Sequence, residues 1–119
     1  MLVYDHVEQF LGAGHDPCLV RLSQELSQGV TSYPLAYTIR SVFGRDPNPM
    51  TDLSYMLHQY SNLVPNMRLL GTFVDNHDID RYRRINPDLQ AARSALTYVF
   101  FSMGLPIVYY GTGQSTALE

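Results

Sequence analysis

The sequence is poor in cysteine, in basic charge and in long apolar runs, and each shortage excludes a class of protein. Cys18 is the single cysteine among 119 residues, so no internal disulfide framework can form. The longest apolar run, around 98–101, is far shorter than the roughly 20 residues of a membrane-spanning helix. Eight Lys and Arg residues stand against eleven Asp and Glu residues, which gives a net charge of −3. We therefore expect neither nucleic acid nor an anionic membrane surface as a partner.

Signals for processing are also missing from the sequence. No basic segment follows Met1, so we do not expect a secretion signal at this start. No Asn-x-Ser/Thr triplet offers a glycosylation site, and there is no internal repeat, low-complexity tract or domain boundary. With 45% hydrophobic and 16% charged residues, the chain is predicted to form one compact soluble unit.

The spacing of apolar residues predicts an alternation of strands and helices. Strands are expected near 2–8, 30–33, 69–75 and 106–110, the last of them fully buried. Helices are expected after Pro17, from Pro34 to Phe43, from a cap at Thr51, and from Asn86 and Pro87 along an apolar stripe at 89–103. This alternation is typical of a parallel sheet whose strands are joined by right-handed crossovers.

Four polar residues stand directly after the apolar run of the strand at 69–75. They are Asp75, Asn76, His77 and Asp78. Each polar group at the end of a buried strand needs a hydrogen-bond partner or water, so packing alone does not account for them. We therefore expect the strand to deliver these side chains to the mouth of a cleft.

Three of the predicted strands end in residues that can carry chemistry. Glu8 ends the first, the segment 75–78 ends the third, and Tyr109 and Tyr110 end the fourth. Function in parallel α/β folds gathers at the carboxyl ends of the strands, so Glu8 and Asp78 are expected on a common rim. Two carboxyl groups there suggest glycosidic chemistry, which needs a proton donor and negative charge near an oxocarbenium-like centre.

These blocks resemble the α-amylase family, glycoside hydrolase family 13. Residues 69–78 are similar to the seventh strand of its (β/α)8 barrel with the polar block that closes it, and 104–112 to its eighth strand. Residues 30–43 are similar to the sixth strand with its helix, and 7–17 to the fifth-strand block. A whole TIM barrel needs about 250 residues. The resemblance therefore implies that residues 1–119 are the C-terminal half of a (β/α)8 barrel, a partial glycoside hydrolase catalytic domain.

The resemblance also implies roles for the polar block. Asp78 matches the carboxylate that stabilises the transition state without attacking the sugar, and His77 matches the histidine that hydrogen-bonds sugar hydroxyls. Asn76 would contribute to the substrate site, and Asp75 would support it from behind. No metal ligand is expected in this chain.

Two further residues, Glu8 and Arg81, are assigned through the same resemblance, and two tyrosines are candidates from their position alone. Glu8 would be the general acid/base, with a pKa raised by partial burial and by neighbouring carboxylates. Arg81 matches an arginine just past the polar block and would orient that loop. Tyr33 and Tyr109, each near a strand end, are candidate stacking platforms for sugar rings.

The sequence also departs from the family pattern. The nucleophilic aspartate of the family lies in a fourth-strand motif that these residues do not include. Gly113 stands where the family usually has glutamate, Ser32 where it usually has asparagine, and Val7 where it usually has glycine. The expected parent hydrolyses α-1,4-glucans such as starch or glycogen with retention, and the isolated chain is expected to be inactive.

The resemblance extends to the surroundings of that parent. Calcium would belong to the full-length parent and not to this chain, and an extracellular location is expected of the parent alone. An α-glucan is the expected partner. A half-barrel made by itself is expected to self-associate, because its sheet edges stay open.

Other interpretations stay open. Residues 75–78 could form an Asx-turn or a helix cap beside a surface histidine, and Glu8 could be an ordinary edge-strand carboxylate. His77, Asp78 and Asp80 could hold a hard cation, although their spacing is unspecific. For the chain as a whole, the alternatives are a non-catalytic glucan-binding or interaction module and a fragment without a separate role.

Overall fold

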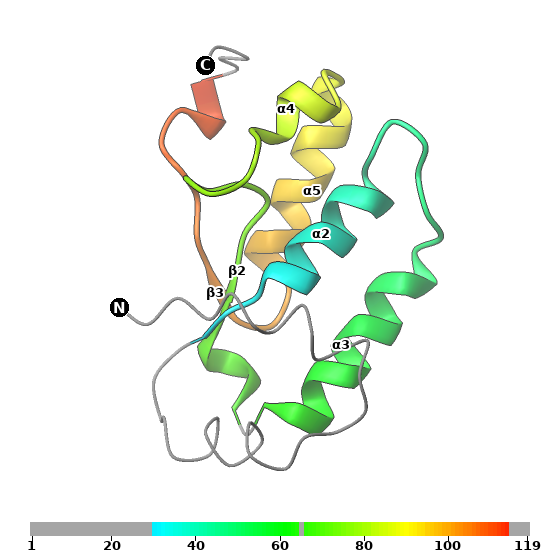
Figure 1. Ribbon diagram of the computed structural model, residues 1–119, viewed down its shortest axis with the longest axis vertical. Coiled ribbons are helices and arrows are strands. Elements are labelled where there is room, and N and C mark those ends of the chain that lie inside the picture. The colour runs from blue at the N-terminus through cyan, green and yellow to red at the C-terminus, as the bar shows by residue number, and fades with distance from the viewer. Residues whose placement is uncertain (1–29, 65, 115–119) are drawn as a thin grey trace.

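A computed structural model describes residues 30–64 and 66–114 of the chain. Its order of elements is the predicted alternation of strands and helices (Figure 1). The predicted strand at 2–8, the helix after Pro17 and the side chain of Glu8 lie outside the described residues. The expectation that Glu8 and Asp78 share a rim is therefore untested and stays a prediction.

Three short strands form a parallel sheet. They are β1 (Val30–Thr31), β2 (Leu70–Thr72) and β3 (Leu105–Pro106), in the order β1-β2-β3. Val30 pairs with Leu70, and Gly71 pairs with Leu105, so both ladders are parallel as predicted. The helical elements are α2 (Tyr33–Val42), α3 (Thr51–Leu63), η1 (Met67–Leu69), α4 (Tyr82–Ile85), α5 (Leu89–Phe101) and η2 (Thr112–Gln114).

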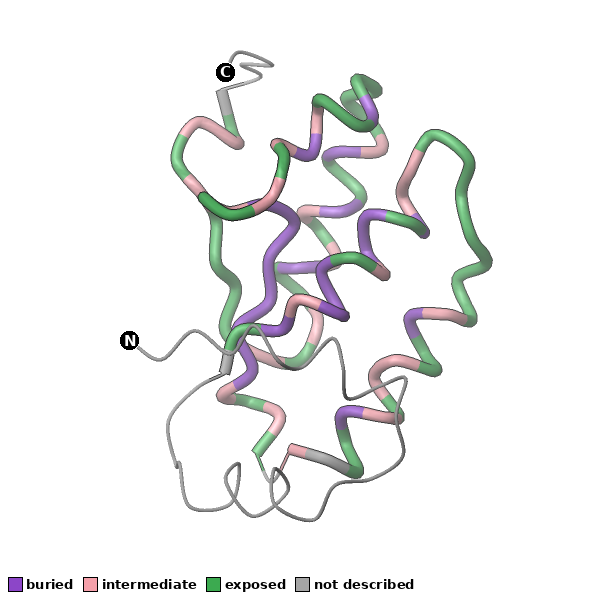
Figure 2. The backbone as a smooth tube through the Cα atoms, viewed as in Figure 1, coloured by how far each residue is buried: buried purple, intermediate pink, exposed green. Residues whose placement is uncertain are grey.

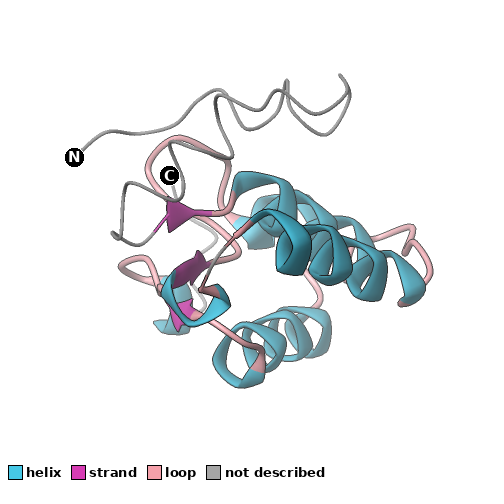
Figure 3. Cartoon of the chain, turned by 90° about the horizontal axis from the view of Figure 1, so that it is seen from below, coloured by secondary structure: helices cyan, strands magenta, loops and turns pink. Residues whose placement is uncertain are grey.

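Helices α2, α3 and α5 lie on one side of the sheet (Figures 1 and 3). Helix α2 packs against α3, and α5 packs against β3. The buried residues gather between the sheet and these helices (Figure 2). This core consists of Leu35, Ile39, Val42, Leu53, Tyr60, Leu70, Val74, Tyr82, Ala92, Ala95 and Val99. Within the described ranges, no helix combines the length and the apolar character needed to cross a membrane.

The helix predicted from Pro34 is present and begins one residue earlier, at Tyr33, whereas the predicted caps of two other helices are wrong. Ser32 caps α2, with its Oγ accepting a hydrogen bond from the Leu35 backbone N–H at 3.2 Å. Thr51 was predicted to cap α3 but is its first helical residue, after Met50. Asn86 and Pro87 were predicted to open α5, which Asp88 caps instead through the N–H of Gln90.

The position of Asn86 has a physical reason. Its side-chain Nδ2 donates to the carbonyl oxygen of Phe43 at 3.0 Å, and its Oδ1 accepts from the N–H of Asp88 at 3.1 Å. Asn86 ends the short helix α4 and links it to the end of α2. The side chain of Asn86 is thus engaged at the end of α4, two residues before Asp88, the cap of α5.

The strands are shorter than predicted, because turns and caps begin early. β1 ends before residue 33 because Ser32 already caps α2. β2 was predicted over 69–75, but Leu69 belongs to η1 and the ladder ends at Thr72. Phe73 and Val74 are buried beyond the end of the ladder.

The prediction of a fully buried strand at 106–110 is wrong. β3 spans Leu105–Pro106, and the exposed fractions of Leu105, Ile107 and Val108 are 50%, 41% and 45%. β3 is the outer strand of the described sheet, and in the described part of the chain no strand pairs with its far side. An apolar run in the sequence shows that a strand is suited to burial. Whether the strand is buried depends on a neighbouring strand or helix that covers it.

Gly104 makes the turn from α5 into β3 possible. Its φ of +131° lies in a region that L side chains rarely adopt. A Cβ atom built on Gly104 would collide with the backbone carbonyl oxygen of Leu70, on the neighbouring strand β2. The close approach of this turn to β2 therefore requires glycine.

We predict that Gly104→Ala lowers the free energy of unfolding by about 1–3 kcal/mol, because it adds both backbone strain and a steric collision. Gly113→Ala is the matched control, since a Cβ atom there meets nothing within 4 Å. Urea unfolding followed by circular dichroism compares the two variants with the wild type. Equal midpoints for both variants would contradict this account of Gly104.

Candidate active site

The polar segment 75–78 follows β2 and divides into a buried and an exposed part. Asp75 is 3% exposed, whereas the side chains of His77 and Asp78 are 58% and 42% exposed. Phe73 and Val74, both buried, fix the chain just before the segment. The first polar residue is thus available for internal contacts and the last two for contacts with a ligand.

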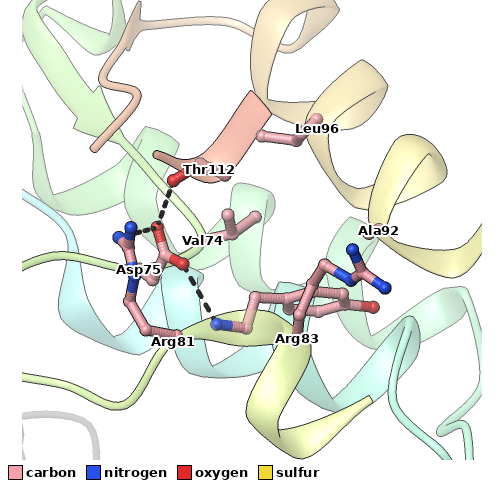
Figure 4. Close-up of a pocket in the computed structure, with 8 residues that line it drawn as sticks. Val74, Asp75, Arg81, Arg83, Ala92, Leu96 and Thr112 are labelled. Atoms are coloured by element: carbon pink, nitrogen blue, oxygen red, sulfur yellow. Dashed lines mark hydrogen bonds and ion pairs between the residues drawn. The ribbon is translucent and has the colours of Figure 1, made fainter. Parts of the chain in front are cut away.

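The carboxylate of Asp75 joins three separate stretches of chain (Figure 4). Its Oδ2 accepts a hydrogen bond from the backbone N–H of Tyr82 at 3.0 Å, at the start of α4. Its Oδ1 accepts from the Thr112 hydroxyl at 3.1 Å and lies 3.8 Å from Nη1 of Arg81. Buried carboxylates are stable only with such partners. The structure places Asp75 behind the exposed part of the segment, where its carboxylate is bound by protein groups alone in the described residues.

Arg81 connects the loop after β2 with the segment after β3. Its guanidinium carbon lies 4.7 Å from the ring centre of Tyr109 and 5.0 Å from that of Tyr110. Nη2 of Arg81 donates to the carbonyl oxygen of Tyr110. The guanidinium of Arg81 thus covers one face of the Tyr109 ring, so a sugar ring cannot stack on that face. Arg81 itself is engaged with protein groups.

The exposed part of the segment is held by Tyr33, the first residue of α2. The Tyr33 hydroxyl donates to Oδ2 of Asp78 at 2.5 Å and accepts from Nδ2 of Asn76 at 2.9 Å. Oδ1 of Asn76 accepts from the N–H groups of Asp78 and Ile79 at 2.9 and 3.1 Å. The Asx-turn that was one of the alternative interpretations is thus present. It brings Asp78 back toward Tyr33.

His77 completes this group. Its Nε2 lies 3.2 Å from Oδ1 of Asp78, on the opposite side of the carboxylate from Tyr33. The ring of Tyr33 meets that of Phe73 edge to face, with 5.2 Å between centres. The structure therefore brings together Tyr33, Asn76, His77 and Asp78, all of which the sequence nominated. They present a carboxylate beside an imidazole at the carboxyl end of β2.

Arg40 was missed by the sequence analysis. It lies in the last turn of α2 and is 7% exposed, and its Nη1 donates to the carbonyl oxygens of Val74 and Asp80 at 3.0 and 2.6 Å. Burial lowers the pKa of Arg40, and the nearby charge of Asp75 acts in the opposite direction. The available signal was a charged residue on the apolar face of α2, next to Ile39.

Tyr82 was also missed. Burial raises its pKa to about 12, and its hydroxyl donates to the carbonyl oxygen of Phe43. Its backbone N–H is the one that binds Asp75. Tyr82 therefore fixes α4 against the end of α2 and against the polar segment.

A small cavity lies behind Asp75, away from the exposed pair. It is lined by Val74, Asp75, Arg81, Tyr82, Arg83, Ala92, Leu96 and Thr112 (Figure 4). Its volume of about 20 Å³ has room for about one water molecule, and none for a sugar ring.

A metal site at His77, Asp78 and Asp80 was an open alternative. In residues 30–64 and 66–114, no three His, Cys, Asp or Glu side chains gather in a way that could hold a metal ion. The carboxylate of Asp80 instead lies 3.4 Å from Nη1 of Arg84, one turn along. The described residues give this alternative no support.

Comparisons with known proteins show that the chain is similar to α-amylases and cyclomaltodextrin glucanotransferases. No family model matches it. α-Amylase 1 of Schwanniomyces occidentalis is 30% identical over 112 residues, covering 94% of this chain and 21% of that protein. A cyclomaltodextrin glucanotransferase of Paenibacillus macerans is 30% identical over 113 residues, covering 94% of this chain and 16% of that protein. The chain thus spans about a fifth of the length of these relatives, or less.

Two solved structures of α-amylases are also similar to this chain. An α-amylase from Malbranchea cinnamomea superposes with a TM-score of 0.74 at 31% identity, over 87% of this chain and 22% of that chain. An Anoxybacillus α-amylase superposes with a TM-score of 0.72 at 28% identity, over 87% of this chain and 24% of that chain.

We predict that Asp75→Asn destabilises the fold by about 2–4 kcal/mol. An amide cannot accept from both Tyr82 and Thr112 through two equivalent oxygens, and Arg81 loses its anion. Asp46→Asn, at an exposed loop position, should change stability by less than about 0.5 kcal/mol. Urea unfolding measures both, and an equal, small effect of the two substitutions would show that Asp75 does not hold the site together.

Proposed function

We propose that this chain, which is a partial domain of the α-amylase family, glycoside hydrolase family 13, carries one wall of a site for α-1,4-glucans such as starch or glycogen. The observation that carries the proposal is the exposed pair of His77 and Asp78, fixed by Tyr33 and Asn76 at the carboxyl end of a parallel strand. The longer parent would be an α-amylase-like glycosidase that hydrolyses these glucans with retention of configuration.

The two exposed residues are suited to different parts of this task. The imidazole of His77 can exchange hydrogen bonds with sugar hydroxyls, which are both donors and acceptors. The carboxylate of Asp78 supplies negative charge near a centre that becomes positive in the transition state. Because Tyr33 holds Oδ2, the carboxylate is oriented before substrate arrives.

The remaining catalytic groups are assigned by resemblance. Glu8 would act as the general acid/base, and the nucleophile would come from a fourth-strand segment that these 119 residues do not include. Retaining hydrolysis needs acid and nucleophile about 5–5.5 Å apart. With one of the pair missing, the isolated chain should bind glucan without cleaving it. Calcium would belong to the parent and not to this chain.

We further propose that the chain is the C-terminal half of a (β/α)8 barrel. The exposed apolar side chains from the end of α5 to the residues just after β3 support this, because they are suited to burial against further strands and helices. They are Phe101, Met103, Leu105, Ile107 and Val108, with exposed fractions between 41% and 87%. The short share of the relatives' length that the chain spans supports it as well. Made alone, the chain would cover this surface by self-association.

A non-catalytic glucan-binding module is the second candidate function. It is favoured by the exposure of His77 and Asp78, whose polar groups are suited to hold a sugar. Both candidates require that glucan bind at His77 and Asp78, and they differ in whether a longer protein cleaves it.

We predict that maltoheptaose binds to the purified chain and shifts the amide resonances around 76–79 in NMR spectra. His77→Ala and Asp78→Asn should each weaken binding by about threefold to tenfold, the loss expected for one or two hydrogen bonds. The control is His58→Ala, an exposed histidine on α3, which should leave binding unchanged.

The same chain should release no reducing sugar from starch. Absence of maltoheptaose binding, or an equal loss in the His58 and His77 variants, would overturn the proposed site. Release of sugar that persists in Asp78→Asn would show that the role proposed for Asp78 is wrong.

A further inference from the structure

We propose that Arg40 is a positioning residue that holds the loop 75–80 in the shape that presents His77 and Asp78. The loop begins after Val74, which is buried beyond the end of β2, and reaches α4 after Asp80; Arg40 bonds to the backbone carbonyls of Val74 and Asp80. This inference concerns the same site, and it rests on the proposed function, in which His77 and Asp78 bind glucan.

One nitrogen atom makes both contacts. Nη1 of Arg40 donates to the carbonyl oxygen of Val74 at 3.0 Å and to that of Asp80 at 2.6 Å. The two carbonyls bracket the loop residues 75–79, so a single planar group sets the separation between the loop's ends. Neither contact involves a side chain of the loop. Arg40 therefore acts on the shape of the loop and not on a ligand.

Burying the guanidinium of Arg40 would be unfavourable in free energy without its hydrogen bonds to the loop. The residue is 7% exposed, and the other buried residues of its helix are all apolar. Withdrawing a guanidinium from water costs free energy unless its N–H groups find acceptors. Here the acceptors are the carbonyls at the two ends of the polar loop, and Asp75 supplies a nearby opposite charge.

Helix α2 contacts the loop at two places. Tyr33 in its first turn binds Asp78 and Asn76, and Arg40 in its last turn binds the loop's two ends. Because both residues belong to one ten-residue helix, the loop is fixed against a single rigid body. Loss of the Arg40 contacts should let the loop move relative to Tyr33, and the orientation of Asp78 would be lost with it.

A purely structural role would have a different effect. Were Arg40 important only for the core, its substitution would lower protection against hydrogen exchange throughout the described fold by one common factor. A positioning role predicts a local effect, at the amides that report on the loop. These are the N–H groups of Asp78 and Ile79, bound to Asn76, and that of Tyr82, bound to Asp75.

The test is amide hydrogen exchange, measured by NMR on the glucan-free chain. In Arg40→Met, the exchange rates at Asp78, Ile79 and Tyr82 should rise about tenfold relative to the core amides of Ala95 and Val99 in α5. Arg40→Lys keeps the charge and can reach one carbonyl, so we expect a smaller rise, about threefold. Arg45→Met, at an exposed position just past the same helix, should change nothing.

Unchanged loop exchange in both Arg40 variants would overturn the proposal, and so would an equal rise at loop and core amides. If Arg40→Met does not fold, Arg40→Lys alone decides between these results. Maltoheptaose titration separates the two levels of the account. Absence of binding to the wild type defeats the proposed function and leaves the exchange result standing. A loosened loop with full wild-type affinity in Arg40→Lys defeats the positioning role.

Discussion

The buried carboxylate of Asp75 is the constraint on which the rest of the site depends. It binds the start of α4 through Tyr82, the segment after β3 through Thr112, and the guanidinium of Arg81, which also covers Tyr109. The ends of two neighbouring strands and one helix are thereby tied to a single side chain. With this residue fixed, the chain must turn immediately, and the following residues are carried outward.

The outward turn gives the site its chemical character. Asn76 closes the turn with its own side chain, and Tyr33 receives Asp78 on the far side. A carboxylate and an imidazole are left partly exposed and in contact with each other. Tyr33 and Arg40 both belong to α2, which packs into the core. The orientation of His77 and Asp78 is therefore set by a helix of the core. Stability and presentation of the site thus have the same physical origin.

The sequence predicted the parts of the molecule that depend on local pattern. Alternating apolar segments predicted parallel strands with helices between them, and four polar residues after a buried strand indicated where a candidate site lies. What it could not predict depends on contacts between distant residues. Asn86 was assigned to the wrong helix because its partner, Phe43, lies far away in sequence. β3 was expected to be buried because its residues are apolar, although its outer neighbour is not among the described elements. Arg40 could not be assigned to the loop, because reaching Val74 and Asp80 is a property of the tertiary fold.

The most direct test of this account is a crystal structure of the chain in complex with maltoheptaose. The account predicts a glucose unit with hydroxyls within about 2.6–3.2 Å of Nε2 of His77 and of the Asp78 carboxylate. It also predicts that Tyr33 keeps its hydrogen bond to Asp78 in the complex. A sugar bound elsewhere on the chain, or an Asp78 carboxylate turned away from Tyr33 and from the sugar, would contradict it.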